Sequence, residues 1–496
     1  MTDHDVVIIG AGASGIGAAV KLLGQGVRDF VVLEKADGVG GTWRANTYPG
    51  CACDVPSALY SFSFAPNPSW TRAFAGQPEI LDYLRDVATR YGVTPHVRFG
   101  TELTRAQWDD TARRWVLETT RGRFTARLVI AGAGPWNEPL IPDLPGLLDF
   151  PGEVFHSAWW NHDYDLRGKR VAVVGSGASA VQFVPRIQPH VASLHLFQRT
   201  AQWVLPKPDH HVPRVERYLL RRFPALQRAL RSAEYLGMEA LGVGFRHPAV
   251  LRAVQAVGRA HLLATVRDPA LRRALTPDYT LGCKRLLFSN EYYPALTRPN
   301  VRVHPHAVRL VEGSTVVGTD GSRSEVDCVI LGTGFRILDM PLAERVFDAD
   351  GRSLADHWRG SPSAYLGTTV SGFPNAFLLL GPNLGTGHSS AFMILEAQLA
   401  YVMDAVRTIR AAGWSSVDVR PEVQAAYDAE VQAALPSTVY NAGGCSSYYL
   451  DVNGRNSFSW PWSTGRMRER IRVFDPAAYT VRAESDHSDR PLGDRA

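Results

Sequence analysis

The sequence has few cysteines, no long apolar run and little net charge, and each shortage excludes a class of protein. Five cysteines are scattered through 496 residues, unlike the disulfide framework of a small secreted domain. No apolar stretch approaches the roughly twenty residues of a membrane span. The net charge of +5 gives no global sign of nucleic-acid binding, so we expect no nucleic-acid partner. We expect reduced thiols at all five cysteines: Cys51, Cys53, Cys283, Cys328 and Cys445.

The sequence also lacks an N-terminal targeting pattern, because strand-like residues begin by Asp5, and we expect a cytoplasmic location. With 45% hydrophobic residues the chain can bury a large core, and its length predicts two or three domains. The only internal similarity that we find is between two glycine-rich units. These two units carry most of the information about function.

The first unit, GAGASG at 10–15, directly follows an apolar run and opens an alanine-rich helical stretch. The next apolar run ends in Glu34. Together these features complete the βαβ dinucleotide fingerprint. Gly10, Gly12 and Gly15 permit a tight turn and a close backbone approach to a pyrophosphate at the helix N-terminus. The Glu34 carboxylate can accept hydrogen bonds from ribose hydroxyls.

The second unit, GSGASA at 175–180, also follows an apolar run, but its next strand ends in Arg199 and Thr200 instead of an acid. An arginine beside a hydroxyl suits a 2′-phosphate, which a carboxylate would repel. We therefore predict FAD at the first unit and NADPH at the second. The alternative is that Arg199 is a solvated surface charge. The predicted contacts within the unit are Gly175, Gly177, Ser179 and Ala180.

The order of the two units predicts an α/β fold with two Rossmann-like dinucleotide-binding domains. We expect a discontinuous FAD-binding domain at 1–150 and 331–482, with the NADPH-binding domain inserted at 151–330. The apolar residues 326–335 predict the strand that returns to the first domain. The tail at 483–496 is expected to be disordered.

Local patterns predict several further elements. Apolar spacing with a proline in the first turn predicts a helix over 78–91, and apolar runs predict a sheet pair over 115–118 and 124–131. A long helix is predicted over about 389–409. Its N-terminus could face the flavin pyrimidine edge, although a plain core helix is an equally good interpretation.

A helical insertion is predicted over about 213–275, within the second domain. Between Arg214 and Arg273 it holds twelve arginines, no lysine and four acidic residues. Such a stretch could contact anionic lipid in a peripheral manner. We favour the alternative of a solvated helical face that covers the substrate entrance, because runs of charge are usually solvated.

The run FPGEVFHSAWWN at 150–161 lies between the two units. It resembles the F-x-G-x-x-x-H-x-x-x-W-(P/D) fingerprint of type I Baeyer-Villiger monooxygenases, with matches at Phe150, Gly152, His156 and Trp160. The last position departs from the family, because Asn161 stands where the family has Pro or Asp. Flavin-containing monooxygenases and N-hydroxylases carry a related motif without the tryptophan.

Other segments resemble the same family, in the same order, over most of the chain. CKR at 283–285 is similar to the family's catalytic arginine segment, and GPN at 381–383 and WP at 460–461 extend the likeness towards the tail. The flavin-side segment of the family is matched by Gly41, Thr42, Trp43, Asp54 and Tyr60.

The resemblance implies a reaction. In the family, NADPH reduces FAD, dioxygen adds to the flavin C4a, and the peroxyflavin anion converts a ketone to an ester or lactone. The anion needs a cation, and by resemblance Arg285 supplies it while Asp54 orients the guanidinium. His156 is assigned to positioning NADPH or coupling domain motion, and Trp460 to a loop that closes over cofactor and substrate.

Simpler interpretations stay open for several of these residues. Arg285 could form a structural ion pair, Asp54 could cap a turn, and Trp460 could belong to the core. Two other functions also stay open: a related monooxygenase that oxygenates sulfur or nitrogen, motivated by Asn161, and an NADPH oxidase or regulatory flavoprotein without oxygen transfer. A disulfide reductase that uses Cys51 and Cys53 is disfavoured, because a C-x-C bridge in an extended segment is strained. No metal is expected.

Overall fold

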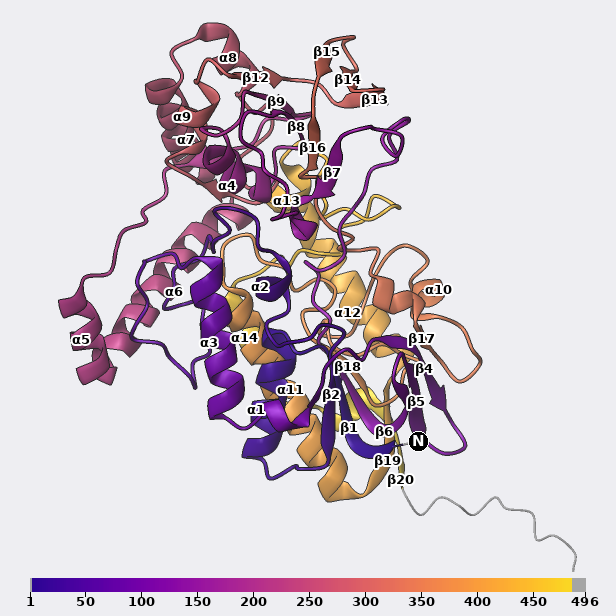
Figure 1. Ribbon diagram of the computed structural model, residues 1–496. Coiled ribbons are helices and arrows are strands. Elements are labelled where there is room, and N and C mark those ends of the chain that lie inside the picture. The colour runs from indigo at the N-terminus through magenta and orange to yellow at the C-terminus, as the bar shows by residue number, and fades with distance from the viewer. Residues whose placement is uncertain (1, 484–496) are drawn as a thin grey trace, which may run out of the picture.

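The computed structural model describes residues 2–483, and the structural statements below concern this part of the chain. Two sheets with their own helices lie at opposite ends of the molecule, and a group of helices extends to one side (Figure 1). The predicted α/β class with two Rossmann-like units is confirmed. Ala483 ends the last strand, and the rest of the tail predicted at 483–496 lies outside the described residues.

The larger sheet is built around buried parallel strands that match the apolar runs beside the first glycine-rich unit. Its order is β17-β4-β5-β6-β1-β2-β3, and β18 also pairs with β6. Val6 to Ile9 are buried on both faces, as a central parallel strand requires. The strands are β1 (Thr2–Ile9), β2 (Phe30–Leu33), β3 (Val97–Arg98), β4 (Leu103–Asp109), β5 (Arg114–Thr119), β6 (Gly122–Ala131), β17 (Val346–Phe347) and β18 (Ala376–Leu378).

The helices of this domain confirm the local predictions. The helix predicted at 78–91 is α3 (Gln77–Arg90), and the one predicted at about 389–409 is α11 (Ala391–Ala412). Both pack against α1 (Ala13–Gly24), which follows the first glycine-rich turn. The predicted sheet pair is the antiparallel pair β5 and β6.

The second sheet is entirely parallel, with the order β12-β9-β8-β16-β7. Its crossover helix α4 (Ala178–Ile187) follows the second glycine-rich turn and packs on α9 (Tyr292–Leu296). The strands are β7 (Glu153–His156), β8 (Arg170–Val174), β9 (Ser193–Phe197), β12 (Val301–His304) and β16 (Cys328–Leu331). A small antiparallel sheet lies at its side, formed by β13 (Val308–Glu312), β14 (Thr315–Gly318) and β15 (Arg323–Glu325).

One strand belongs to a different sheet than predicted. The residues expected to return the chain to the first domain form β16, which pairs with β7 and β8 inside the second sheet. All four residues of β16 are buried, so the strand needs partners on both edges and cover on both faces. The chain rejoins the larger sheet only at β17, which pairs with β4.

Helices fill the predicted insertion: α5 (Arg214–Arg222), α6 (Pro224–Arg246), α7 (Leu251–Thr265) and α8 (Pro269–Ala274). In Figure 1, α5 lies at the outer end of α6, away from both sheets. The C-terminal part adds α12 (Pro421–Ala434), α13 (Val439–Ala442), α14 (Thr464–Arg470), β19 (Trp414–Val419) and β20 (Tyr479–Ala483). Among the helices of residues 2–483, none has both the length and the apolar character needed to cross a bilayer.

Two cysteines are joined, so the expectation of five reduced thiols is wrong for Cys283 and Cys445. Their sulfur atoms are 2.08 Å apart, and they are separated by 162 residues in the sequence. The fold brings them together because the segment after α8 packs on the loop after α13, where the Thr280 amide donates to the Gly443 carbonyl at 2.9 Å. The other three cysteines are free and buried.

Candidate active site

The first glycine-rich turn brings backbone against backbone, which explains its glycines. Gly10 has a φ of +91°, which favours glycine, and a Cβ on Gly15 would lie 1.8 Å from the Gly10 carbonyl oxygen. A Cβ on Gly41 would lie 2.8 Å from the Cα of Gly12. Gly12 is the N-cap of α1, so the free amides of the first helical turn face the space beside it. This cradle fits the pyrophosphate of a dinucleotide.

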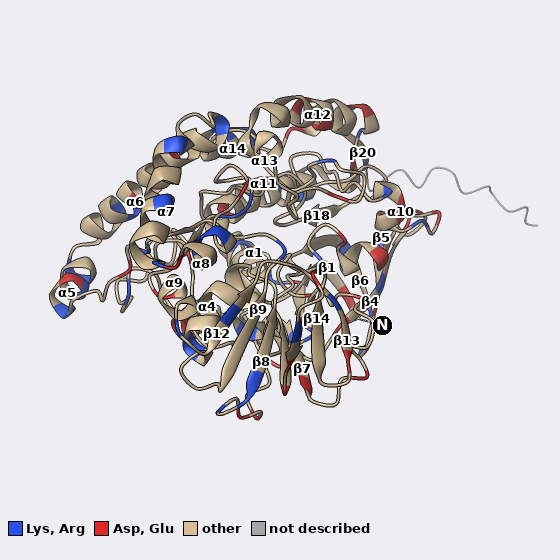
Figure 2. Cartoon of the chain, turned by 90° about the horizontal axis from the view of Figure 1, so that it is seen from above, with Lys and Arg blue, Asp and Glu red and all other residues tan. Residues whose placement is uncertain are grey.

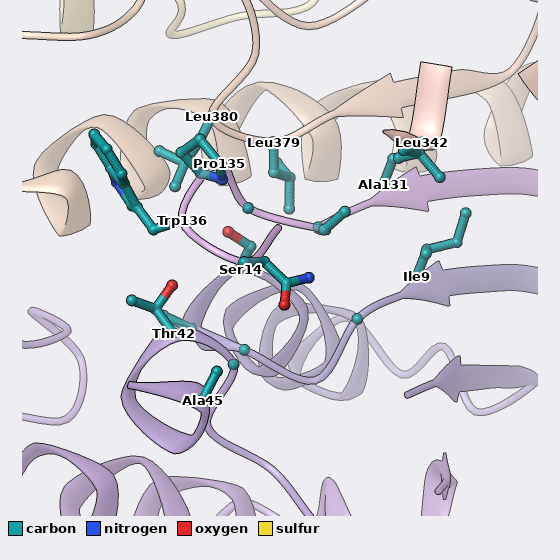
Figure 3. A pocket seen from close by; sticks show the side chains of 18 of the residues that line it. Ile9, Ser14, Thr42, Ala45, Ala131, Pro135, Trp136, Leu342, Leu379 and Leu380 are labelled. Atoms are coloured by element: carbon teal, nitrogen blue, oxygen red, sulfur yellow. The ribbon is translucent and has the colours of Figure 1, made fainter. Parts of the chain in front are cut away.

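A cavity of about 440 Å³ opens beside this turn. Figure 3 shows it framed by Thr42 and Ala45 on one side and by Trp136 and Leu380 on the other, with the ends of two strands at Ile9 and Ala131. The cavity brings together most of the residues predicted to hold FAD: Gly10, Gly12, Glu34, Gly41, Thr42, Trp43 and Tyr60. Trp136 and Leu380 were not predicted, because no motif marks them.

Glu34 directly follows β2, and two backbone amides hold its carboxylate in place. One carboxylate oxygen accepts a hydrogen bond from the Ala11 amide at 2.6 Å, and the other accepts one from the Ala36 amide at 2.8 Å. The carboxylate is buried and lines the cavity. Each oxygen keeps a further lone pair, so Glu34 can also accept hydrogen bonds from ribose hydroxyls.

The second glycine-rich turn repeats the geometry of the first in the other sheet. Gly175 has a φ of +102°, and a Cβ there would lie 2.4 Å from the Gly332 carbonyl oxygen. Gly177 is the N-cap of α4, and Ala180 is buried in the first turn of that helix. Ser179 lies beside Tyr48 of the first domain. The turn therefore stands at the contact between the two domains.

Arg199 and Thr200 follow β9, where the first domain has Glu34 after β2. Arg199 is exposed. It also lies near Lys284, whose pKa is lowered first by burial and next by the Arg199 charge. Two cations thus meet beside the second turn. The sequence did not predict that Lys284 adds positive charge beside the second turn, because it places this residue only as a neighbour of Arg285.

Arg285 and Asp54 form a two-pronged ion pair between the domains. Arg285 Nε donates to Asp54 Oδ2 at 2.8 Å, and Nη2 donates to Oδ1 at 2.7 Å. Burial alone would raise the pKa of Asp54, but the guanidinium outweighs burial and holds that pKa below its usual range. The Asp54 charge in turn raises the pKa of Arg285 well above its usual value. Both groups are therefore charged at neutral pH.

The ion pair lies next to the cavity but does not line it. Tyr60 lines the cavity and is close enough to feel the charges of Asp54 and Arg285, and its hydroxyl accepts a hydrogen bond from Trp43 Nε1 at 3.1 Å. The side chain of Arg285 keeps 31% of its surface exposed, although its charge is paired. A permanent cation is therefore held at the edge of the predicted flavin site.

His156 and Trp460 occupy different surroundings. His156 ends β7, where its Nδ1 accepts a hydrogen bond from the Ala158 amide at 3.0 Å, and burial lowers its pKa to about 4. It is neutral at pH 7 and lies beside Phe335 of the segment after β16. Trp460 is buried, and its Nε1 donates to the Ser463 carbonyl at 3.0 Å. Trp460 packs as a core residue in this structure, and its predicted role in a closing loop stays a prediction.

The thiols of Cys51 and Cys53 are unsuited to redox catalysis. Both are buried and free, and burial raises the pKa of Cys51 to about 12 and that of Cys53 further. A thiol must ionise to attack a disulfide, so neither residue is a ready nucleophile. This agrees with the weak case for a disulfide reductase.

Comparison with known proteins gives three kinds of match. The family model for pyridine nucleotide-disulphide oxidoreductases matches residues 7–238. A Streptomyces coelicolor protein named Baeyer-Villiger monooxygenase is 50% identical over 479 residues, which cover 96% of this chain and 92% of that protein. A Pseudomonas aeruginosa protein of the same name is 47% identical over 96% of this chain and 90% of its own length.

Solved structures match over nearly the whole chain. An oxidized steroid monooxygenase bound to NADP is 29% identical, with a TM-score of 0.85, and the match covers 97% of this chain and 100% of that one. The OTEMO complex with FAD and NADP is 25% identical, with a TM-score of 0.87 and coverage of 96% and 99%. The first of these proteins is bound to NADP, and the second to FAD and NADP.

Proposed function

The chain belongs to the Baeyer-Villiger monooxygenases, and we propose that its two turns bind FAD and NADPH while Arg285 and Asp54 serve the oxygenation of a ketone. It is an NADPH-dependent flavoprotein monooxygenase. When bound and reduced by NADPH, FAD would supply the chemistry that inserts an oxygen atom from dioxygen beside a ketone carbonyl to give an ester or lactone. The small-molecule ketone and dioxygen are the partners of the reaction, and we place the enzyme in the cytoplasm, where NADPH is supplied.

The FAD site comprises the first turn and the cavity beside it. The amides at the start of α1 face the pyrophosphate, and Glu34 accepts hydrogen bonds from the ribose. Gly41 allows the approach of the second backbone segment that closes the turn. Thr42, Trp43 and Tyr60 line the cavity wall, and Tyr60 also lies near the charges of Asp54 and Arg285.

The NADPH site comprises the second turn and the end of β9. Gly175, Gly177, Ser179 and Ala180 form the phosphate cradle. Arg199 and Lys284 carry the positive charge that a 2′-phosphate needs, and Thr200 adds a hydroxyl donor. His156, neutral and at the carboxyl edge of the same sheet, positions the nicotinamide half.

The ion pair of Arg285 and Asp54 is the observation that carries the proposal. A guanidinium cannot lose its proton at working pH, so it stabilises negative charge that develops on activated oxygen. Asp54 holds the guanidinium plane through two hydrogen bonds, which fixes the direction of the remaining N–H groups. One residue of the pair comes from each domain, so domain movement can change the position of the cation.

Product analysis tests this function. The FAD-loaded enzyme is supplied with NADPH, dioxygen and a panel of cyclic, linear and aryl ketones together with a sulfide, and ester, sulfoxide and peroxide are counted per NADPH consumed. We expect an ester or lactone from at least one ketone. Sulfoxide as the sole organic product would favour a heteroatom monooxygenase, and peroxide in full yield with every compound would favour an oxidase.

A further inference from the structure

The helical insertion exposes an unusual amount of apolar side chain. Seventeen large hydrophobic side chains are exposed in the described part of the chain, and ten of them lie between Val215 and Leu263. Val215 is 69% exposed, Tyr218 is 64% exposed and Phe223 is 51% exposed. A face that was merely solvated would carry polar side chains at these positions. The interpretation favoured from the sequence, a solvated charged face, is therefore incomplete.

The exposed apolar side chains continue along one side of α6. Their spacing of three and four residues places them on one helical face. Arg228 is the only charged residue among the exposed residues of α6. The stripe consists of Leu226, Ala229, Ala233, Leu236, Ala240 and Val243, all of them exposed.

The opposite side of α6 is fixed to the body of the protein, so the stripe cannot turn inward. Arg231 donates to the carbonyls of Ala58 at 2.7 Å and Ser61 at 2.9 Å, and it pairs with Glu396 at 3.6 Å. Further along the helix, Glu239 pairs with His388 Nε2 at 3.1 Å. These contacts hold the apolar stripe towards solvent.

Most arginines around the stripe have no acidic partner among the described residues. Arg231 alone among the twelve arginines of the insertion forms an ion pair within the part of the chain that the structure describes. Arg221 donates to Ser69 Oγ at 3.0 Å. Figure 2 shows the arginines of α5, together with Glu216, at the outer edge of the molecule, and both views place this helix away from the sheets. Five arginines near the stripe form no ion pair within residues 2–483: the exposed Arg214, Arg221, Arg222 and Arg228, and the half-buried Arg217.

We propose that this α5–α6 surface binds the face of a lipid bilayer that contains anionic headgroups. We define the surface as the five arginines above together with Val215, Tyr218, Leu219, Phe223 and the α6 stripe. Guanidinium groups pair with lipid phosphates, while the apolar side chains enter the boundary between headgroups and acyl chains. The proposal concerns binding alone and does not depend on the oxygenation reaction.

Charge decides between lipid and a second copy of the chain. Two copies that met through this surface would bring their unpaired arginines together, and juxtaposed like charges cost free energy. An uncharged apolar partner would leave the arginines without counter-charges. A bilayer with anionic headgroups satisfies the arginines and the apolar side chains at the same time.

Vesicle sedimentation tests the proposal with the FAD-loaded enzyme. Vesicles of phosphatidylcholine are compared with vesicles in which about one third of the lipid is phosphatidylglycerol, at low and high salt. We expect binding to the anionic vesicles, weak binding to the neutral ones, and release as salt screens the arginines. Equal binding to both compositions, or no binding to the anionic vesicles, would overturn the proposal.

Matched variants separate this surface from general charge. Arg221→Gln/Arg222→Gln should weaken binding by about fivefold for each arginine removed, and Leu219→Ser/Phe223→Ser should abolish it. Arg28→Gln/Arg309→Gln removes the same charge from exposed positions elsewhere, and Val452→Ser removes an exposed apolar side chain elsewhere, so both should bind normally. Unchanged NADPH oxidation shows that each variant is folded.

Two outcomes of the variant series would contradict the proposal. Controls that lose as much binding as the α5 variants would show that total charge, and not this surface, controls association. Sedimentation velocity without lipid gives the second outcome. A dimer that dissociates on Leu219→Ser/Phe223→Ser would show that a second copy covers the surface instead of lipid.

Discussion

The two glycine-rich turns use the same backbone geometry but carry opposite charges. Each turn begins with a glycine of positive φ after a buried strand, and each places a glycine at the N-cap of the next helix. At the end of the second strand, however, the first domain has Glu34 held by two amides, and the second has the exposed Arg199 near Lys284. In our proposal the backbone binds phosphate in both domains, and the residue that follows the second strand selects the nucleotide.

The turns also differ at their third small residue. In the first turn, Gly15 has no room for a side chain, because a Cβ would lie 1.8 Å from the Gly10 carbonyl oxygen. In the second turn this place is taken by Ala180. A Cβ added to the neighbouring Gly332 would still lie 3.6 Å from the Ala180 Cβ. Helix α1 therefore leaves no room for a side chain at this place, whereas α4 accommodates a methyl group. At the first glycine the order is reversed, because an added Cβ would lie 2.8 Å from a carbonyl oxygen at Gly10 and 2.4 Å from one at Gly175.

The largest effect on activity is expected from removing the ion pair that joins the two domains. Arg285→Ala should lower ketone oxygenation by about 100- to 1000-fold, the usual loss when a donor to developing negative charge is removed. NADPH should still be consumed, with peroxide as the product. Ester and peroxide formed per NADPH are measured.

Arg285→Lys and Asp54→Asn serve as the graded controls. Lysine keeps the charge but loses the two-pronged geometry, so we expect partial activity. Asp54→Asn leaves the cation but removes its fixed orientation, and should lose less activity than Arg285→Ala. Full ketone oxygenation by Arg285→Ala would show that another group supplies the catalytic cation.

Much of this arrangement could be predicted because it is local in sequence. The glycines, Glu34 and Arg199 lie within short βα units whose pattern specifies both the turn and the end of the next strand. The helices α3 and α11 were predicted from similarly local patterns. Helix α3 buries one apolar stripe, and α11 is an apolar segment that is buried over most of its length. Arg285 and Asp54 needed the family resemblance, because nothing in their spacing indicates contact.

Features that depend on distant contacts were missed or misplaced. The disulfide joins Cys283 to Cys445, and no local pattern marks either residue. Strand β16 is an apolar run that fits either sheet, and only its pairing with β7 and β8 decides which one. Lys284 lies near Arg199 in the structure, although the whole helical insertion separates the two residues in the sequence. Single-sequence patterns do not carry such long-range information.

A smaller effect is expected from a substitution that tests how closely Gly15 approaches the Gly10 carbonyl in the first turn. Gly15→Ala forces a Cβ against the Gly10 carbonyl, so we expect a loss of about 3 kcal/mol, at the upper end for overpacked sites, and poor retention of FAD. The flavin content and the unfolding temperature of the purified protein are measured. Gly177→Ala is the control in the second turn, where the nearest atom to a new Cβ would be 4.0 Å away. Equal losses of stability in both variants would show that the close contact at Gly15 does not cause the loss.

The smallest expected effect concerns the charge that distinguishes the turns. Arg199→Ala removes a cation from the 2′-phosphate position, so the KM for NADPH should rise by about tenfold to a hundredfold, the range for a lost charge-assisted hydrogen bond. The KM for NADH should hardly change, because NADH has no 2′-phosphate. Arg302→Ala, an exposed arginine on the neighbouring strand β12, is the control and should leave both constants unchanged. If Arg199→Ala instead raised both constants equally, Arg199 would act on the fold or on the shared part of the nucleotide. The difference between the two turns would then depend on Lys284 or on the backbone, and not on the residue that ends the second strand.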